Sequence, residues 1–81
     1  MTKRDKELAH IRRNIRGVRF EELDNVLLRF GFERTQSKGG SSHYVYVREA
    51  YQITVAKREP FIHLKTVNQA LDILDEILDA Q

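Results

Sequence analysis

Apolar positions along the 81 residues of the chain recur at helical spacing in three segments. In the clearest segment, from Phe20 to Phe30, they fall three or four residues apart and therefore share one face of a helix. Acidic residues crowd its first turn, where the helix dipole favours anions, and Gly31 follows where a left-handed residue commonly ends a helix. The pattern predicts a helix that ends at Gly31.

The other two helical segments lie near the two ends of the chain. Between residues 4 and 15 a thin apolar stripe predicts a short helix, which we expect to pack loosely or on a partner. A broader stripe between residues 67 and 78 predicts a final helix with its acidic residues exposed. Thr66, with Gln69 three residues later, predicts a capping box at the start of that helix.

Between these helices the spacing changes to the alternation typical of strands. Three stretches alternate or are rich in Tyr and Val, namely residues 32–36, 42–48 and 52–56. The connections between them are short enough for hairpins. The predicted order is α-α-β-β-β-α. This is an α+β fold in which a three-stranded antiparallel sheet carries helices on one face, as in double-stranded-RNA-binding domains, with an extra helix at the N-terminus.

The second predicted strand is apolar on both faces. Tyr44 and Tyr46 alternate with Val45 and Val47, whereas the helices can cover only one face of the sheet. Tyrosines can pack in a core or stack on RNA bases, and we expect core packing. Val45 and Val47 then lie on the open face together with His43.

Length and composition indicate a single domain that acts in a reducing compartment. We expect residues 1–81 to share one domain, with a basic helical extension over 1–17 and a core over 18–81. A domain of this size buries only about 60 to 65% of its unfolded-chain surface, so a partner is expected. The absence of cysteine excludes disulfides and thiolate sites, and the apolar runs predict no membrane span, so we expect a cytoplasmic protein.

Charge is segregated along the chain although the formal net charge is only +2. Residues 1–19 carry a net charge of +5 and residues 34–65 carry +4, whereas residues 20–33 carry −3 and residues 66–81 carry −4. The basic segments favour contact with a polyanion such as RNA. An arginine-rich helical face is also often merely solvated, so both interpretations of the N-terminal segment stay open.

One loop combines the residue types that phosphate chemistry needs. Lys38 is followed by two glycines, by Ser41 and Ser42, and then by His43. Glycines let a phosphodiester approach closely, hydroxyl groups bind its oxygens, and a histidine takes or gives a proton near neutral pH. The same residues also form an ordinary hairpin connection beside an exposed histidine, so the residues alone leave both interpretations open. His10 and His63 have no ligand-like neighbours and are interpreted as surface or half-buried histidines.

The chain between Val18 and Leu78 resembles the HicA family of toxins. The resemblance rests on Val18-Arg19-Phe20-Glu21-Glu22-Leu23, Leu27-Leu28, Gly31-Phe32-Glu33, Gly40-Ser41-Ser42-His43-Tyr44-Val45-Tyr46 and Ile53-Thr54-Val55. It implies a metal-independent ribonuclease without a cofactor, neutralised by a HicB antitoxin, with His43 as the catalytic residue. The family often has Val-Pro-x-His at the end of the third strand, where this chain reads Val55-Ala56-Lys57-Arg58, so a second histidine is absent.

These observations lead to a hypothesis of an mRNA interferase toxin of a type II toxin-antitoxin system. The RNA 2′-hydroxyl attacks the phosphate, His43 acts as general acid or base, and basic residues offset the developing charge. No acidic cluster suited to Mg²⁺ is evident, so neither a metal nor a membrane is an expected partner. The expected RNA-binding residues are Lys38, Gly40, Ser41, Ser42, Lys57 and Arg58, and Val45 and Val47 are the expected antitoxin contacts. Two alternatives remain, a non-catalytic RNA-binding module and an adaptor that binds only protein.

Overall fold

The computed structural model describes residues 2–36 and 42–80 and confirms the predicted α+β fold. Three helices and a three-stranded antiparallel sheet follow the order α-α-β-β-β-α, with one additional 3-10 turn, η1. The elements are α1 (Lys3–Arg13), η1 (Ile15–Gly17), α2 (Phe20–Arg29), β1 (Glu33–Gln36), β2 (His43–Arg48), β3 (Tyr51–Ala56) and α3 (Leu64–Asp79).

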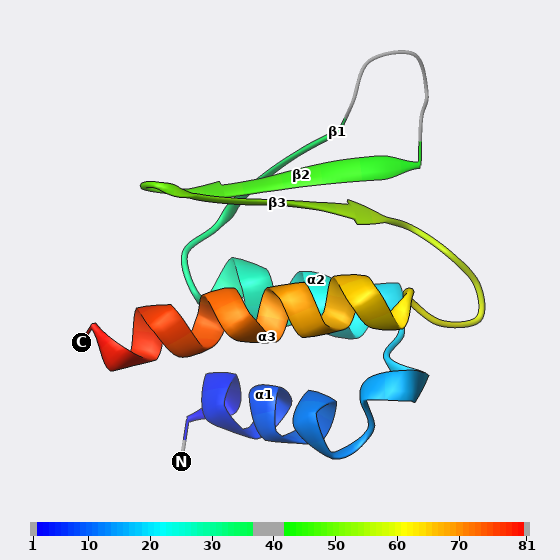
Figure 1. Cartoon of the computed structure of the whole chain (residues 1–81), viewed down its shortest axis with the longest axis horizontal. Coiled ribbons are helices and arrows are strands. Elements are labelled where there is room, and N and C mark those ends of the chain that lie inside the picture. Colours follow the sequence, from blue (N-terminus) through cyan, green and yellow to red (C-terminus); the bar gives the residue numbers. More distant parts are fainter. Residues whose placement is uncertain (1, 37–41, 81) are drawn as a thin grey trace.

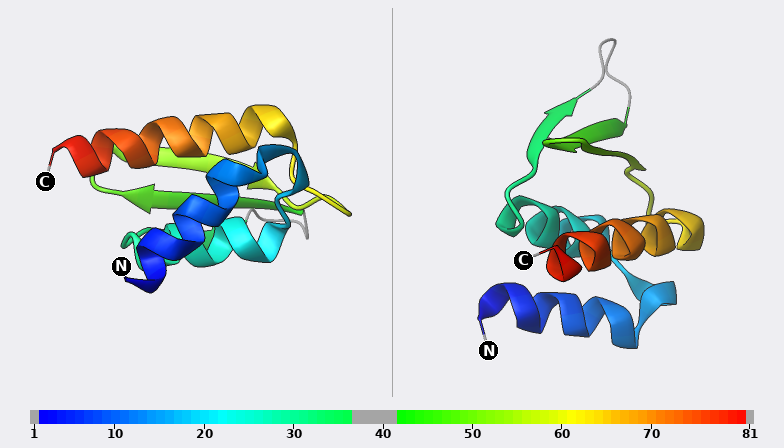
Figure 2. Two further views of the ribbon diagram at one scale, coloured as in Figure 1. Left: turned by 90° about the horizontal axis from the view of Figure 1, so that it is seen from below. Right: turned by 60° about the vertical axis from the view of Figure 1, so that its left-hand side comes forward.

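The sheet and the helices form three layers (Figure 1). The sheet has the strand order β1-β2-β3, and both neighbouring pairs are antiparallel. Helices α2 and α3 lie side by side under one face of the sheet, and α1 lies across them on the side away from the sheet (Figure 2). Within the described residues, no helix covers the other face of the sheet.

The sheet buries one face and exposes the other, as its sequence alternation predicts. Tyr46 and its cross-strand partner Ile53 are 0% and 1% exposed, and Val55 is 1% exposed, so these side chains face the helices. On the opposite face Val45 is half-buried and Val47 is 39% exposed. The open face is therefore the one predicted for His43, Val45 and Val47.

Helix α2 begins and ends where its local signals predict. The backbone N–H of Arg19, at the N-cap, donates to the Glu22 carboxylate at 3.0 Å. At the other end Gly31 has φ 91°, in the left-handed region that glycine adopts without a steric cost. The N–H of Phe32 then donates to the Leu27 carbonyl at 3.1 Å, which satisfies a carbonyl at the helix end.

The N-terminal helix packs tightly, contrary to the prediction of loose packing. Leu8 and Ile11 are 4% and 1% exposed and belong to the same hydrophobic cluster as α2, α3 and the sheet. Polar contacts flank this thin stripe and attach α1 to both neighbouring helices. These contacts join Glu7 to Arg29, His10 to Glu22, Arg12 to Asp75, and the Arg4 guanidinium to the ring of Phe30. Leu8 and Ile11 of α1 therefore contribute to the same core as the rest of the described chain.

Helix α3 begins earlier than predicted, at Leu64, and the proposed Thr66 capping box is wrong. His63 is the N-cap, and its Nδ1 accepts a hydrogen bond from the backbone N–H of Lys65 at 3.2 Å. The preceding residue is anchored because the N–H of Ile62 donates to the Val18 carbonyl at 2.8 Å. This long-range anchor determines where the chain can turn into the helix. Within residues 2–36 and 42–80, no helix is long and apolar enough to span a membrane.

Candidate functional site

The start of β2 and the end of β3 meet at one end of the sheet. His43, the first residue of β2, lies opposite Ala56, the last residue of β3. One residue farther out, the backbone N–H of Lys57 donates to the carbonyl of Ser42 at 2.9 Å. The histidine is therefore held on a paired strand, immediately beside the chain segment that carries Lys57 and Arg58.

His43 is exposed and shares the open face of the sheet with two valines. Strand alternation places it with Val45 and Val47, because Tyr44 and Tyr46 pack on the helix side. The register places Thr54 opposite Val45 and Gln52 opposite Val47. The valines thus form a small apolar strip beside polar neighbours, and the histidine lies at its end.

Lys57 turns away from this face, toward α2. Its ammonium group lies 5.3 Å from the centre of the Phe20 ring, and the Phe20 ring lies 5.0 Å from the ring of Tyr44, centre to centre. Lys57 therefore lies at the same end of the sheet as His43 but on the helix side. The expectation that Lys57 flanks His43 holds for the backbone and not for the direction of the side chain.

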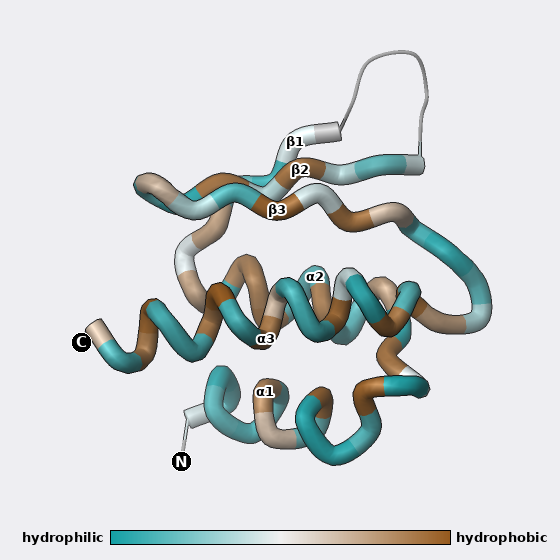
Figure 3. Tube along the Cα trace, in the orientation of Figure 1, coloured by the Kyte–Doolittle hydropathy of each residue, from teal (hydrophilic) through white to brown (hydrophobic). Residues whose placement is uncertain are grey.

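A cleft of about 210 Å³ surrounds the N-terminal end of α2. Its walls come from the start of α2 and from the segment that follows β3, which is hydrophilic where it leaves the sheet (Figure 3). Three cations and two carboxylates line it together with Phe20 and Pro60: Arg19, Lys57, Arg58, Glu21 and Glu59. The cleft brings Arg19, which lies far from Lys57 in the sequence, into the same basic site.

Beneath the sheet, Asp24 joins β1 and β2 to α2. Its Oδ1 accepts hydrogen bonds from the Tyr46 hydroxyl at 2.6 Å and from Arg34 Nη1 at 2.8 Å. The Arg34 guanidinium also lies 5.8 Å from the centre of the Tyr44 ring. Burial first, and then the bond to Asp24, raises the pKa of Tyr46 above its ordinary value, so its hydroxyl stays protonated. This arrangement stabilises the strand that presents His43.

The other two histidines have structural contacts. His10 Nε2 lies 2.8 Å from a Glu22 carboxylate oxygen between α1 and α2, and His63 caps α3. Among the described residues, no group of three or more His, Asp or Glu side chains is placed to hold a metal ion. His43 is therefore the histidine whose position best suits proton transfer to a ligand on the open face.

The structure brings together only part of the predicted RNA-binding set. Ser42 lies beside His43, and Lys57 and Arg58 lie at the cleft, whereas Lys38, Gly40 and Ser41 lie outside the described residues. Sequence reasoning did not include Arg19 in the site. One signal was available, since Arg19 directly precedes the predicted α2 within a basic segment. The side of the sheet to which Lys57 points could also have been predicted, because residues 53, 55 and 57 lie on the same face of an alternating strand.

Comparisons with known proteins give no relative for this chain. No protein-family model matches it, and neither the curated proteins nor the solved structures contain a match.

Proposed function

We propose that the chain is an RNA endonuclease toxin of a type II toxin-antitoxin system, acting on mRNA in the cytoplasm. The observation that carries the proposal is the position of His43. This exposed, titratable side chain lies on the open face of the sheet, at the end where Lys57, Arg58 and Arg19 gather. The resemblance of its surroundings to the HicA family supports the same assignment.

The proposed reaction is a transesterification within the RNA. The 2′-hydroxyl oxygen attacks the adjacent phosphorus, the bond from phosphorus to the 5′-oxygen breaks, and a 2′,3′-cyclic phosphate and a free 5′-hydroxyl result. Neutral His43 removes the proton of the 2′-hydroxyl, or protonated His43 supplies the proton that the leaving oxygen needs. With one histidine in the described site, solvent completes the other transfer. DNA lacks the attacking hydroxyl and should not be cut.

Basic side chains next to His43 supply the electrostatic part of this mechanism. Lys57 and Arg58 lie at the end of β3, whose last residue pairs with His43. Cations beside an RNA strand attract its phosphates and hold the strand in place. Their place on the helix side of the sheet edge suits contacts to neighbouring phosphates of the same RNA strand better than contacts to the cleaved one.

The open face of the sheet is the proposed contact surface for a HicB-like antitoxin. Val47 is 39% exposed and Val45 is half-buried, and both lie on the face that carries His43. Apolar surface of this kind favours a protein partner. A stable interface buries on the order of 1,200 to 2,000 Å² in total, so on a chain of this size it would extend over His43 and exclude RNA.

The decisive experiment compares His43→Ala with His10→Ala in cleavage of a single-stranded RNA. Removal of a proton-transfer group typically lowers the rate by about 10² to 10⁴, so His43→Ala should be nearly inactive. His10→Ala removes an exposed histidine on α1, outside the sheet, and should retain activity. Cleavage should persist in EDTA, yield cyclic phosphate ends, and fail when a deoxyribonucleotide replaces the residue before the cut.

Two results would overturn this assignment. Full cleavage by His43→Ala would remove the proposed catalytic residue. If the unaltered protein binds RNA and never cuts it, the chain is instead a non-catalytic RNA-binding module on the same fold.

A further inference from the structure

Two segments that are distant in the sequence meet at the basic end of the molecule. The residues between η1 and α2 lie beside the segment that connects β3 to α3 (Figure 1). A backbone hydrogen bond joins them, from the N–H of Ile62 to the carbonyl of Val18 at 2.8 Å. Arg16 and Arg19 flank Val18 in the sequence, so the fold fixes them beside the segment that carries Lys57 and Arg58.

Arg16 and Arg19 differ from the arginines that form ion pairs in the described part of the chain. Both are exposed, and no carboxylate in the described part of the chain forms an ion pair with them. By contrast, Arg12, Arg29 and Arg34 each pair with a carboxylate on a neighbouring element. Charges that stay unpaired on a rigid surface attract an external anion more strongly than charges already compensated.

The four cations come from two chain segments that meet near one end of the sheet. Lys57 and Arg58 come directly after β3, the strand whose last residue pairs with His43. Arg19 lines the same cleft as Lys57 and Arg58. Arg16 lies in η1, three residues before Arg19. A single nucleic-acid strand carries its charge as a row of separate phosphates, and cations arranged along a groove are the usual means of holding it.

We infer that the RNA-binding surface continues from the cleft to η1, with Arg16 and Arg19 holding the backbone of nucleotides that flank the cut. This inference rests on the proposed function, because it takes RNA as the ligand. It assigns the substrate as a single strand long enough to pass from the open face around the edge of the sheet. Packing of η1 against α3, with Ile15 against the hydrophobic core, keeps η1 in place.

The test measures binding of single-stranded RNA by His43→Ala protein, which should not cut the ligand during the measurement. In this background Arg16→Gln and Arg19→Gln are introduced together. Two lost phosphate contacts should lower the salt dependence of binding by about 1.4 in log–log slope and weaken binding roughly twentyfold at 0.1 M salt. Arg16→Lys with Arg19→Lys keeps both charges and should restore most of the affinity.

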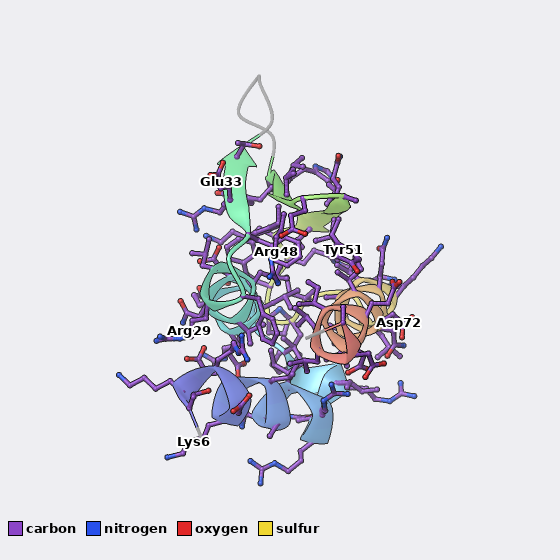
Figure 4. The ribbon with its side chains drawn as sticks, turned by 90° about the vertical axis from the view of Figure 1, so that its left-hand side faces the viewer. Lys6, Arg29, Glu33, Arg48, Tyr51 and Asp72 are labelled. Carbon is purple, nitrogen blue, oxygen red and sulfur yellow. The ribbon has the colours of Figure 1, made fainter. Side chains whose placement is uncertain are left out.

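The matched control is Lys3→Gln with Lys6→Gln, which removes the same charge from the first half of α1, away from η1 and the cleft. Lys6 projects away from the helix layer (Figure 4), and both lysines are exposed. This double variant should keep its affinity and its salt slope. Equal losses in both double variants would indicate a diffuse attraction to positive charge and would overturn the inference.

RNA length gives an independent readout. The arginine double variant should lose affinity for long oligonucleotides, and the loss should disappear for RNAs of two or three nucleotides, which cannot reach from His43 to η1. An undiminished affinity of the arginine variant for long RNA would also overturn the inference.

Cleavage by the unaltered protein separates this inference from the proposed function. If that protein cuts RNA and the arginine pair has no effect on binding, the extended surface is wrong and the nuclease assignment stands. If binding depends on the arginine pair and no cleavage occurs, the extended surface stands and the nuclease assignment falls.

Discussion

The two faces of β2 are similarly apolar, but one is buried and the other is largely exposed. On the helix side Tyr46 is completely buried, and its hydroxyl is satisfied by Asp24 at 2.6 Å. On the open side Val47, the next residue, is 39% exposed. A tyrosine suits the covered face because its ring fills the core while its hydroxyl reaches a partner. Hydrophobicity alone therefore does not identify the core of this sheet, and the exposed valines need a different explanation.

The largest expected difference between the faces is in folding. Val55 is 1% exposed on the helix side, so Val55→Asp would place an unpaired carboxylate in the core. The cost of several kcal/mol is comparable to the whole stability of a small domain. We expect this variant to be unfolded at 25 °C, as judged by circular dichroism and the loss of a cooperative thermal transition. A folded Val55→Asp protein would contradict the assignment of the buried face.

The same substitution on the open face should leave the fold intact and weaken the proposed complex with an antitoxin. Val45 lies on β2 opposite Thr54, and water can reach a carboxylate there. In the complex that carboxylate would be desolvated without a partner, so Val45→Asp should weaken antitoxin binding by about 2 to 4 kcal/mol. Titration calorimetry with the antitoxin measures this loss. Unchanged affinity would exclude the open face as the interface, and an unfolded variant would show that Val45 belongs to the core.

Features of the fold that are determined by residues close together in the sequence could be predicted, and features that depend on distant residues could not. Helix α2 was predicted from local signals, because acidic residues occupy its first turn and Gly31 follows its C-cap, although the helix ends at Arg29. Period-two alternation separated Val45 and Val47 from the tyrosines. The start of α3 was missed because it depends on the pairing of Ile62 with Val18, across more than 40 residues. The packing of α1 was missed because its narrow stripe is supplemented by polar contacts to α2 and α3, such as the pair between Arg12 and Asp75.

The candidate site divides in the same way. Strand alternation places His43 on the same face as Val45 and Val47, and the expectation that the tyrosines pack in the core identified that face as the open one. The cleft could not be predicted, because Arg19 and Arg58 are brought together by the fold and no sequence spacing relates them. A basic segment in a sequence thus indicates that an anion is bound, and only the tertiary arrangement shows which cations act together.

A smaller effect is expected from the polar contact beneath the sheet. Tyr46→Phe keeps the buried ring and removes the hydrogen bond to Asp24, which still accepts from Arg34 at 2.8 Å. The free energy of unfolding should fall by about 1 to 2 kcal/mol. Chemical denaturation measures the change. The matched control is Tyr44→Phe, because Tyr44 is half-buried and its ring lies near Arg34. This substitution should lower the free energy of unfolding by less than Tyr46→Phe does.

The same tyrosine predicts a dependence of stability on alkaline pH. The pKa of Tyr46 is raised in the folded protein by burial and by Asp24, so the folded state holds this proton more tightly than the unfolded chain. Its contribution is complete below the ordinary tyrosine pKa of about 10 and is lost as the pH rises above that value. Denaturation curves between pH 8 and pH 11 should show a decline that is reduced in Tyr46→Phe. An identical decline in both proteins would assign it to other groups.

The smallest effect is expected at the turn between β2 and β3. This turn determines which side chains of β2 face the helices and which lie on the open face of the sheet. Glu49 and Ala50 connect Arg48 to its partner Tyr51, and a slip of one residue in this register would exchange the two faces of the strand. Glu49 has φ 52°, which disfavours any side chain with a Cβ, so Glu49→Gly should stabilise the protein by about 0.5 to 1 kcal/mol.

Among the described non-glycine residues Glu49 alone has a positive φ, so Ala50→Gly is the matched control. It adds the same flexibility to the unfolded chain without relieving strain and should destabilise slightly. The thermal midpoint should rise for Glu49→Gly and fall for Ala50→Gly, because only the first of the two turn residues is strained. A fall for both variants would show that Glu49 does not adopt the left-handed conformation.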